Sequence, residues 1–378
     1  MSEINKREYQ QCVRCVMDTD AVDIIFDEHG TCNYCSEFLE RSKHILGKNL
    51  ASKEEKLKQI VAKVKANGKG KPYDCIVGVS GGVDSSWTLV EVKRLGLRPL
   101  AVHMDNGWNS ELAQNNISNL LISLDVDLYT HVIDWDEYRE LMQAFFDADV
   151  IDVELLYDNA TLGVNYQQAN KYGLKYILAG TNNATEGMQI PKKWNWFKYD
   201  KRNIKALAKR RGIKELKTFP AIGTGGFIWN HFIKGVRFNS FLDYLDYNKF
   251  EALDDLEKNY GYKRYEYKHY ESIFTRFYQG YILPRKFNVD KRKIHLATLV
   301  ISEQMSRENA LKVLDGTPYL SDADVEKDLT YFLKKMRWSR KQLEEYIARP
   351  EIPHSNYSTE RPVWDNLLAF YKYLFKSR

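Results

Sequence analysis

A glycine-rich turn between an apolar run and a helical stretch is the feature that most constrains how this chain folds. The turn reads Ser80-Gly81-Gly82-Val83-Asp84-Ser85-Ser86. The run before it, Cys75–Val79, has the continuous apolar character of a parallel strand buried on both faces. After it, Val83, Trp87 and Val90 recur with the spacing of a helix that buries one face. The sequence therefore predicts a strand that enters a helix through a tight turn.

The residues of this turn suit a phosphate. Adjacent glycines let the backbone bend sharply and bring bare N–H groups close to a ligand, and the helix N-terminus adds unpaired donors and partial positive charge. Ser80, Ser85 and Ser86 supply hydroxyl donors, whereas Asp84 fits a phosphate if Mg²⁺ lies between them. No Walker lysine motif occurs in the chain. The turn instead resembles the PP-loop of ATP pyrophosphatases, Ser-Gly-Gly-x-Asp-Ser, and the alternative is an ordinary glycine turn.

Apolar runs continue to alternate with helical stretches beyond this turn. We expect further strands over 99–104, 127–133 and 176–179, with helices over 112–124 and from Tyr138. Such alternation predicts an α/β fold with a doubly wound, mainly parallel sheet of the PP-loop type. Ligands bind such sheets just past the carboxyl ends of the strands.

Two of these strand ends carry candidate ATP-binding residues. In PP-loop enzymes the end of the second strand lies beside the adenosine, so Met104, Asp105 and Asn106 are candidates, although an Asn-Gly turn that caps the strand is the simpler interpretation. The segment Gly180–Glu186 resembles the Gly-Thr-x-Asn-x-x-x-Glu block of ammonia-using PP-loop synthetases. That resemblance implies that Gly180 and Thr181 pack over the phosphates. It also implies that Glu186 holds Mg²⁺ together with Asp84.

The amino-terminal cysteines form two pairs with the spacing of a metal site. Cys12-x-x-Cys15 and Cys32-x-x-Cys35 are separated by the sixteen residues from Val16 to Thr31, as in four-thiolate zinc modules. Two disulfides or an iron–sulfur cluster are the alternatives. We expect Val22, Ile24 and Ile25 to form two short strands around a turn at Glu28-His29-Gly30. Cys75 is most simply a small core residue.

Length and composition limit the possible domain organisation and location of the protein. The 378 residues suggest several domains: we expect a zinc module over 1–45, a helical linker over 46–71, an ATP pyrophosphatase domain over 72–235, and a mostly helical region over 236–378. No run is apolar and long enough to span a bilayer, and Met1–Arg14 shows no secretory signal, so a cytoplasmic protein that does not insert in membranes is expected. A net charge of +5 neither requires nor excludes nucleic acid.

The last third interleaves basic and aromatic residues. Blocks at 268–272, 275–280 and 283–295 suit a nucleotide diphosphate, an RNA strand, or a solvated helix face. With the blocks at 106–111, 130–135 and 184–187, they resemble the WbpG-like N-acetyl sugar amidotransferases of bacterial surface-polysaccharide synthesis. The likeness runs from the cysteine pairs to about Leu314. The Lys-His-Tyr-Glu-Ser and Phe-Asn-Val-Asp-Lys-Arg strings carry it most specifically.

This resemblance implies an amidotransferase. ATP·Mg²⁺ would bind the turn through Ser80, Gly81, Gly82, Ser85 and Ser86. The acetamido oxygen of a UDP-linked N-acetyl sugar would take AMP, and ammonia would then expel the AMP to leave an acetamidino group. We expect Lys268, Arg276, Lys286, Lys291 and Arg292 to serve the anionic substrate and His269 to handle protons. The family pairs with a separate glutaminase and a cyclase-like barrel subunit, which are the expected partners. Nucleic acid is not an expected partner.

Two rival interpretations remain at this stage. A PP-loop tRNA-modifying thiolase also joins an amino-terminal zinc module to this loop, but sulfur transfer usually needs a reactive cysteine near the ATP, where only Cys75 is available. A nucleotide-binding interaction protein without turnover would leave Asp84 unexplained. Salt-sensitive tRNA binding would favour the thiolase, and selective UDP-sugar binding the amidotransferase.

Overall fold

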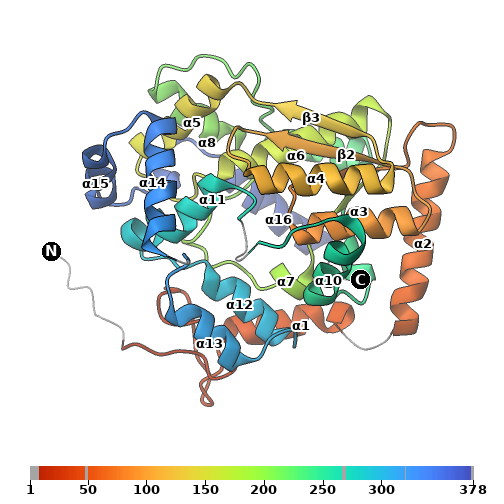
Figure 1. The fold of residues 1–378 in the computed structure, drawn as a ribbon, viewed down its shortest axis with the longest axis horizontal. Coiled ribbons are helices and arrows are strands. Elements are labelled where there is room, and N and C mark those ends of the chain that lie inside the picture. Colours follow the sequence, from red (N-terminus) through yellow and green to blue (C-terminus); the bar gives the residue numbers. More distant parts are fainter. Residues whose placement is uncertain (1–7, 47–49, 266–269, 320, 376–378) are drawn as a thin grey trace.

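A five-stranded parallel sheet forms the centre of the protein (Figure 1). The structure, a computed structural model, describes residues 8–46, 50–265, 270–319 and 321–375. The strands are β1 (Cys75–Gly78), β2 (Pro99–Asp105), β3 (Leu128–Val132), β4 (Tyr176–Ala179) and β5 (Arg237–Ser240). Their spatial order is β3-β2-β1-β4-β5, and every neighbouring pair is parallel.

Helices connect and cover these strands. Before the sheet come α1 (Asn33–Leu46) and α2 (Leu50–Gly68). Between strands lie α3 (Val83–Arg94), α4 (Glu111–Leu124), α5 (Trp135–Asp147), α6 (Leu155–Lys171), α7 (Asn183–Glu186), α8 (Lys201–Arg210), α9 (Thr224–Ile228) and the π-helical η1 (Trp229–Ile233). After β5 follow η2 (Phe241–Tyr244), α10 (Lys249–Tyr260), α11 (Ile273–Phe277), the π-helical η3 (Tyr278–Phe287), α12 (Arg292–Ile301), α13 (Arg307–Asp315), α14 (Asp322–Met336), α15 (Arg340–Ala348), η4 (His354–Asn356) and α16 (Arg361–Phe375).

The central strand is apolar throughout because both of its faces are buried. Cys75 and Val77 belong to a cluster that includes residues of α3, whereas Ile76 belongs to a second cluster that includes residues of α6. Side chains alternate between the two faces of a strand, so a helix layer on each face requires apolar residues at successive positions. The doubly wound α/β fold that the sequence predicts is confirmed.

The predicted strands agree with the observed ones in the sheet but not in the cysteine module. In the module, two isolated antiparallel bridges, Gln11 with Asp18 and Phe26 with Cys32, stand in place of the two short strands predicted around Val22, Ile24 and Ile25. Ile24 is buried there, whereas Val22 and Ile25 are exposed. The predicted turn is present, because the N–H of Asp27 donates to the Thr31 carbonyl at 3.0 Å and that of Asn33 to the Ile25 carbonyl at 2.8 Å. The prediction of two strands was wrong, because the pairing is limited to a single bridge.

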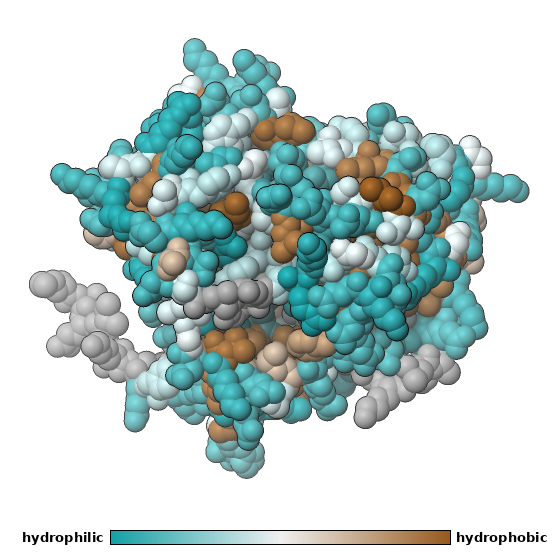
Figure 2. All heavy atoms as spheres, viewed as in Figure 1, coloured by the Kyte–Doolittle hydropathy of each residue, from teal (hydrophilic) through white to brown (hydrophobic). Residues whose placement is uncertain are grey.

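The module, the sheet and the C-terminal helices share one core. A single cluster of buried side chains includes Cys12, Ile76, Val164, Ile294 and Tyr346. The face seen in Figure 2 is mostly hydrophilic, with apolar side chains in separate groups. Among the described residues, no helix combines the length and apolar character needed to cross a bilayer. The three proposed domain boundaries stay predictions.

Candidate active site

The glycine-rich loop lies where the strand order reverses. It follows β1, whose neighbours are β2 on one side and β4 on the other, so the loops after β1 and β4 diverge and leave a crevice between them. Gly180 follows β4 directly and contacts the start of α3. A Cβ at Gly180 would lie 2.7 Å from the carbonyl carbon of Asp84. Only glycine therefore allows this close approach of the β4 loop to the helix start.

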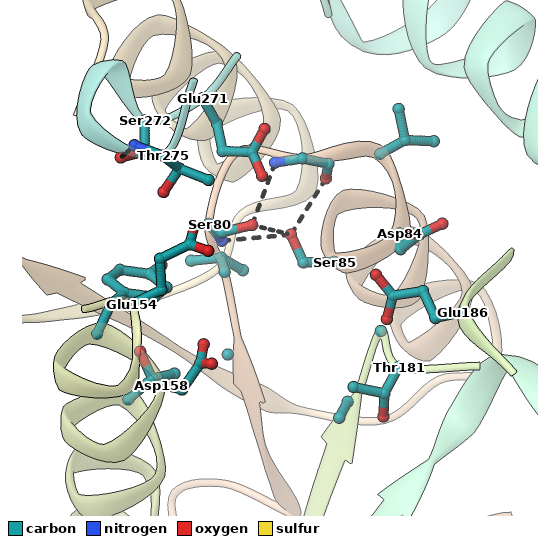
Figure 3. A pocket seen from close by; sticks show the side chains of 18 of the residues that line it. Ser80, Asp84, Ser85, Glu154, Asp158, Thr181, Glu186, Glu271, Ser272 and Thr275 are labelled. Carbon is teal, nitrogen blue, oxygen red and sulfur yellow. Dashed lines mark hydrogen bonds between the residues drawn. The ribbon is translucent and has the colours of Figure 1, made fainter. Parts of the chain in front are cut away.

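The loop is closed by its own side chains, as Figure 3 shows. Ser85 Oγ accepts a hydrogen bond from the Ser80 N–H at 3.2 Å and donates to the Gly82 carbonyl at 3.1 Å. The Gly82 N–H donates to Ser80 Oγ at 3.3 Å. These three residues line a cavity of about 640 Å³, which we call the main cavity. Their hydroxyl and amide groups are the donors that a phosphate needs.

Two predicted loop ligands lie beneath the loop instead of on the cavity surface. Gly81 has a φ of +86°, and a Cβ there would lie 2.9 Å from the Ala113 carbonyl oxygen. Ser86 is 2% exposed, and neither residue is among the described residues that line the cavity. Gly81 therefore shapes the turn, and the structure gives the Ser86 hydroxyl no access to a ligand.

Two tyrosines from the segment after α10 hold the Gly81 carbonyl. The hydroxyl of Tyr262 donates to this oxygen at 3.0 Å and that of Tyr265 at 3.1 Å. Because a trans peptide unit is planar, its C=O and N–H point in opposite directions. Fixing the Gly81 carbonyl therefore fixes the direction of the Gly82 N–H, which lies on the cavity side.

Asp84 and Glu186 lie on one side of the cavity (Figure 3). Asp84 accepts hydrogen bonds from the hydroxyls of Tyr247 and Thr185, the latter at 3.3 Å. Burial, together with Asp84 and Glu186, raises the pKa of the Tyr247 hydroxyl well above its usual value, so it remains a donor. Two carboxylates beside a phosphate-binding loop are the oxygen ligands that a hard divalent cation prefers.

The opposite side of the cavity holds charges that the sequence did not single out. Figure 3 shows Glu154 and Asp158 there, beside the first turn of α6. Lys198 Nζ lies 2.8 Å from Asp158 and Lys291 Nζ 2.7 Å from Glu154. Burial alone would lower the pKa of each lysine, but the neighbouring carboxylates raise both pKa values above the usual one. Both lysines are therefore charged at neutral pH.

The candidates for the adenosine separate into one cavity residue and two turn residues. Met104 lines the main cavity. The carboxylate of Asp105 accepts from the Gly107 N–H at 2.8 Å, and the side-chain oxygen of Asn106 accepts from the Trp108 N–H at 3.1 Å. The interpretation as a turn that caps the strand therefore accounts for Asp105 and Asn106. Thr181, predicted to lie over the phosphates, lines the cavity and has its hydroxyl 3.1 Å from that of Ser240.

Three of the predicted substrate-binding cations are occupied by protein groups. Lys286 donates to Asp149 and to the carbonyls of Tyr346 and Arg349 at 3.0, 2.7 and 2.7 Å. Arg292 binds Asp290 and the carbonyls of Val313 and Gly316, and Arg276 forms a two-pronged pair with the buried Asp328. These partners account for Lys286 as a structural residue. Lys291 alone among the four lines the main cavity.

A second, smaller cavity of about 230 Å³ adjoins the first. The two share five lining residues, namely Lys249, Phe250, Gln279, Lys291 and His295. Beyond them, the small cavity is lined by two of the predicted substrate-binding residues, Arg276 and Arg292, by Tyr270, and by Gly280, Leu296, Leu299, Met305, Val313 and Pro318, with no carboxylate among its described lining residues. The predicted catalytic residues Lys268 and His269 lie outside the described residues.

The four amino-terminal cysteines converge on one point. Their Sγ atoms all lie within 4.8 Å of one another, with Cys12 to Cys35 and Cys15 to Cys32 at 3.8 Å and Cys32 to Cys35 at 3.6 Å. Around a zinc ion with Zn–S bonds of about 2.3 Å, tetrahedral geometry separates the sulfurs by about 3.8 Å. The backbone N–H groups of Cys15 and Cys32 donate to Cys12 Sγ at 3.5 and 3.3 Å. The cluster thus has the dimensions of a single tetrahedral metal site.

The fold and the loop resemble those of the PP-loop ATP pyrophosphatases, a class of ATP-using enzymes. Comparison with protein families supports this class. Residues 50–220 match the family described as NAD synthase. Residues 271–371 match the family described as "LPS biosynthesis protein WbpG-like, C-terminal domain". The chain therefore carries an NAD synthase-type PP-loop domain followed by a WbpG-like C-terminal domain, and the resemblance inferred from the sequence is confirmed at this level.

Individual proteins of known function or structure match this chain over a short segment or at low sequence identity. A GMP synthase (glutamine-hydrolysing) of Pyrobaculum aerophilum is 40% identical over 76 residues, which is 20% of this chain and 15% of that protein. An NMN synthetase structure from Francisella tularensis is 12% identical, covering 58% of this chain and 99% of its own, with a TM-score of 0.29. An NH₃-dependent NAD synthetase structure from Campylobacter jejuni is 15% identical, covering 71% and 99%, with a TM-score of 0.28.

Sequence reasoning missed the residues that act from a distance. Tyr247, Tyr262 and Tyr265 reach the loop from more than 160 positions further along the chain, and Glu154, Asp158 and Lys198 meet only in the folded cavity. The high tyrosine content was the one available signal, with 25 tyrosines in the chain. It does not indicate which of them reach the loop.

Proposed function

We propose that this protein is an ATP-dependent, AMP-forming amidotransferase that acts on a nucleotide-linked N-acetyl sugar. The observation that carries the proposal is the pair of adjoining cavities. The main cavity presents the phosphate-binding loop, and the small cavity extends from it into the WbpG-like domain. An acceptor held in the small cavity can thus reach a nucleotide held by the loop. The family description of that domain supports a role in surface-glycan synthesis.

The chemistry requires activation of an amide. The acetamido oxygen attacks the α-phosphorus of ATP, pyrophosphate leaves, and the amide becomes an O-adenylyl imidate with loss of the N–H proton. Ammonia then adds to the imidate carbon and AMP leaves with the former amide oxygen, so that an acetamidino group remains. An amide resists attack by ammonia because its oxygen is a poor leaving group, whereas AMP is a good one. One well-aimed donor typically contributes about 3–4 kcal/mol in such steps.

The residues of this chain bind and orient the reactants. Ser80, Ser85 and the Gly82 N–H hold the pyrophosphate portion. Asp84 and Glu186 would repel the phosphates unless Mg²⁺ were bound between them, and their oxygens suit that ion. When bound, Mg²⁺ neutralises phosphate charge. The four cysteines would hold Zn²⁺ with no open coordination position, which fits a structural rather than a catalytic metal.

Ammonia must come from outside this cavity. All five cysteines lie in the described part of the chain, and none is among the described residues that line the cavity, so a glutaminase nucleophile is not built into this site. We propose that a separate glutaminase and a cyclase-like barrel subunit supply the ammonia. The same observation disfavours a thiolase: Cys75 is fully buried, and burial raises the pKa of its thiol, so it stays protonated.

The first experiment follows the amide oxygen. The purified protein is incubated with ATP, Mg²⁺, a high concentration of ammonium, and a panel of UDP-N-acetyl sugars whose acetamido oxygen is ¹⁸O. Because NH replaces the labelled oxygen, the sugar product should be about one mass unit lighter than the same sugar without the ¹⁸O label. The ¹⁸O should appear in AMP. Glutamine without partner subunits should give no product. Formation of ADP, or AMP without the label, would overturn the mechanism, and salt-sensitive tRNA binding with sulfur transfer would support the thiolase instead.

A further inference from the structure

The cysteine module packs directly against the short helix that carries Glu186. Figure 1 shows α1 and α12 close below α7 in the lower half of the view, and both helices contact it. Helix α7 has four residues, Asn183–Glu186, which is too short to be stable by itself. Its position must therefore come from its neighbours. The identity of those neighbours decides where the Glu186 carboxylate lies.

One face of α1 makes three contacts with α7 and the residue after it. Phe38 is buried, and a Cβ at Gly187 would lie 2.5 Å from its ring, so the ring packs directly against this glycine. Arg41 donates a hydrogen bond to the Gly187 carbonyl, and the Ser42 hydroxyl lies 3.4 Å from the Asn183 side-chain oxygen. The spacing i, i+3, i+4 places all three side chains on one face of the helix.

The cysteine cluster fixes the start of α1. Cys32 precedes the helix, and Cys35 lies in its first turn. The N–H groups of Cys35 and Ser36 donate to the Cys32 carbonyl at 3.1 and 3.3 Å. Phe38 follows Cys35 by one turn of helix. A metal ion that joins both cysteine pairs would therefore hold the end of α1 from which the contacts to α7 extend.

The module is also held from its far side by the WbpG-like domain. Arg307, at the start of α13, donates to the carbonyls of Cys15 and Cys12 at 2.9 and 3.0 Å. Lys293 of α12 pairs with Asp18 and Asp20, both at 2.5 Å. The module thus contacts both the C-terminal helices and α7, and a displacement of the module would be transmitted to α7.

We infer that Phe38 and Arg41 are positioning residues, through which the four-cysteine metal site holds Glu186 at the ATP cavity. This inference rests on the proposed role of Glu186 in binding ATP with Mg²⁺. A metal that only stabilised the fold would require no contact with α7. The contacts on this single face give the metal site a second effect, on nucleotide affinity.

The first test measures binding without turnover. The probe is an ATP analogue with a methylene bridge between the α- and β-phosphorus atoms, titrated calorimetrically into the full-length protein with and without Mg²⁺. Arg41 is exposed, so Arg41→Ala should leave the fold intact while it weakens binding in Mg²⁺ by roughly fivefold, the loss of one charge-assisted hydrogen bond. Phe38→Ala should weaken it as much or more. Lys43→Ala, which removes another exposed cation of α1, is the matched control and should bind as the wild type does.

A double variant separates positioning from general damage. Glu186→Gln should itself weaken Mg²⁺-dependent binding by roughly tenfold or more. If Arg41 acts through Glu186, then Arg41→Ala added to Glu186→Gln should cause no further loss. If Arg41→Ala weakened nucleotide binding by the same factor in the Glu186→Gln background as in the wild type, the inference would be overturned. An Arg41→Ala variant that binds as tightly as Lys43→Ala would overturn it too. A Glu186→Gln variant with unchanged binding would instead refute the magnesium role within the proposed function.

The second test removes the metal and observes α7 directly. Hydrogen exchange by mass spectrometry is compared before and after treatment with a zinc chelator, on a peptide that covers residues 180–190. In the structure, the N–H groups of Glu186 and Gly187 donate to the carbonyls of Asn182 and Asn183. We expect these amides to exchange at least several-fold faster after metal removal, while those of α14 keep their rate. Unchanged exchange in the 180–190 peptide, with the metal shown to be lost, would overturn the inference.

Discussion

Removal of the two tyrosine hydroxyls on the Gly81 carbonyl is the most direct test of how the loop is held. The variants are Tyr262→Phe, Tyr265→Phe and the double variant. Each keeps the aromatic ring and loses one donor, at 3.0 or 3.1 Å from the carbonyl oxygen. A hydrogen bond of this kind contributes about 1 kcal/mol net, whereas a buried carbonyl left without a partner costs about 1–3 kcal/mol.

These magnitudes predict a response that is not additive. Either single variant leaves one donor on the oxygen, so ATP affinity should fall by about fivefold, the equivalent of about 1 kcal/mol. In the double variant the carbonyl has neither donor and the peptide is free to rotate, which turns the Gly82 N–H away from the phosphate. We expect a loss of about 3–4 kcal/mol, more than the sum of the two single losses, or roughly 150-fold to several hundred-fold.

The assay is titration with the methylene ATP analogue, accompanied by urea unfolding to record stability. Tyr73→Phe is the matched control, because it removes a tyrosine hydroxyl bound to Asp127 at 2.8 Å and far from the loop. It should leave nucleotide affinity unchanged. If the double variant binds the analogue like the wild type, or no worse than the single variants, the reasoning about the peptide direction is refuted.

The remaining predictions concern stability and the substrate site. Lys286→Met should lower the free energy of unfolding by about 3 kcal/mol, because it leaves the buried Asp149 without one of its cationic partners, but it should not change the KM for the sugar. Lys291→Met removes a cation from the wall that the two cavities share, so it should raise the KM for the sugar. Steady-state kinetics and urea unfolding of both variants distinguish the two effects. Burial lowers the pKa of His354 from 6.5 to about 4, so the unfolded chain binds a proton that the folded chain does not, and stability should fall by about 3 kcal/mol as the pH decreases from 6.5 to 4. Urea midpoints across this range should depend less on pH in His354→Gln, and equal pH dependence in both proteins would contradict the assignment.

The local parts of the site were predictable from the sequence because their geometry is local. A strand, a turn and a helix start are specified by adjacent residues, so Ser80, Gly82 and Ser85 could be placed on one loop before any fold was known. The same holds for Gly180 and Glu186, which lie within seven positions of one another after a strand. The cysteine pairs were predictable because their spacing suits a tetrahedral ion. In each case the function of a residue depends on neighbours in the chain.

The roles of the basic residues were not predictable in this way. Arg276, Lys286 and Arg292 looked like anion ligands because their residue types suit phosphates. The partners that occupy Arg276 and Lys286 lie 52 and 137 positions away, at Asp328 and Asp149. A positively charged residue in a sequence gives no sign of whether a carboxylate will meet it in the fold. The structure therefore reassigns Lys286, and it adds Lys198 as a cavity cation.

Local sequence was enough to predict a PP-loop on a doubly wound sheet, a four-cysteine module and a resemblance to WbpG-like proteins. The tertiary structure alone decided how that loop is held, which charges face the cavity, and what the cysteine module touches. The physical reason is the range of the interactions. Backbone conformation and metal-ligand spacing are set over a few residues, whereas the hydroxyl that fixes the Gly81 carbonyl comes from a residue 181 positions away. Only folding brings the two together.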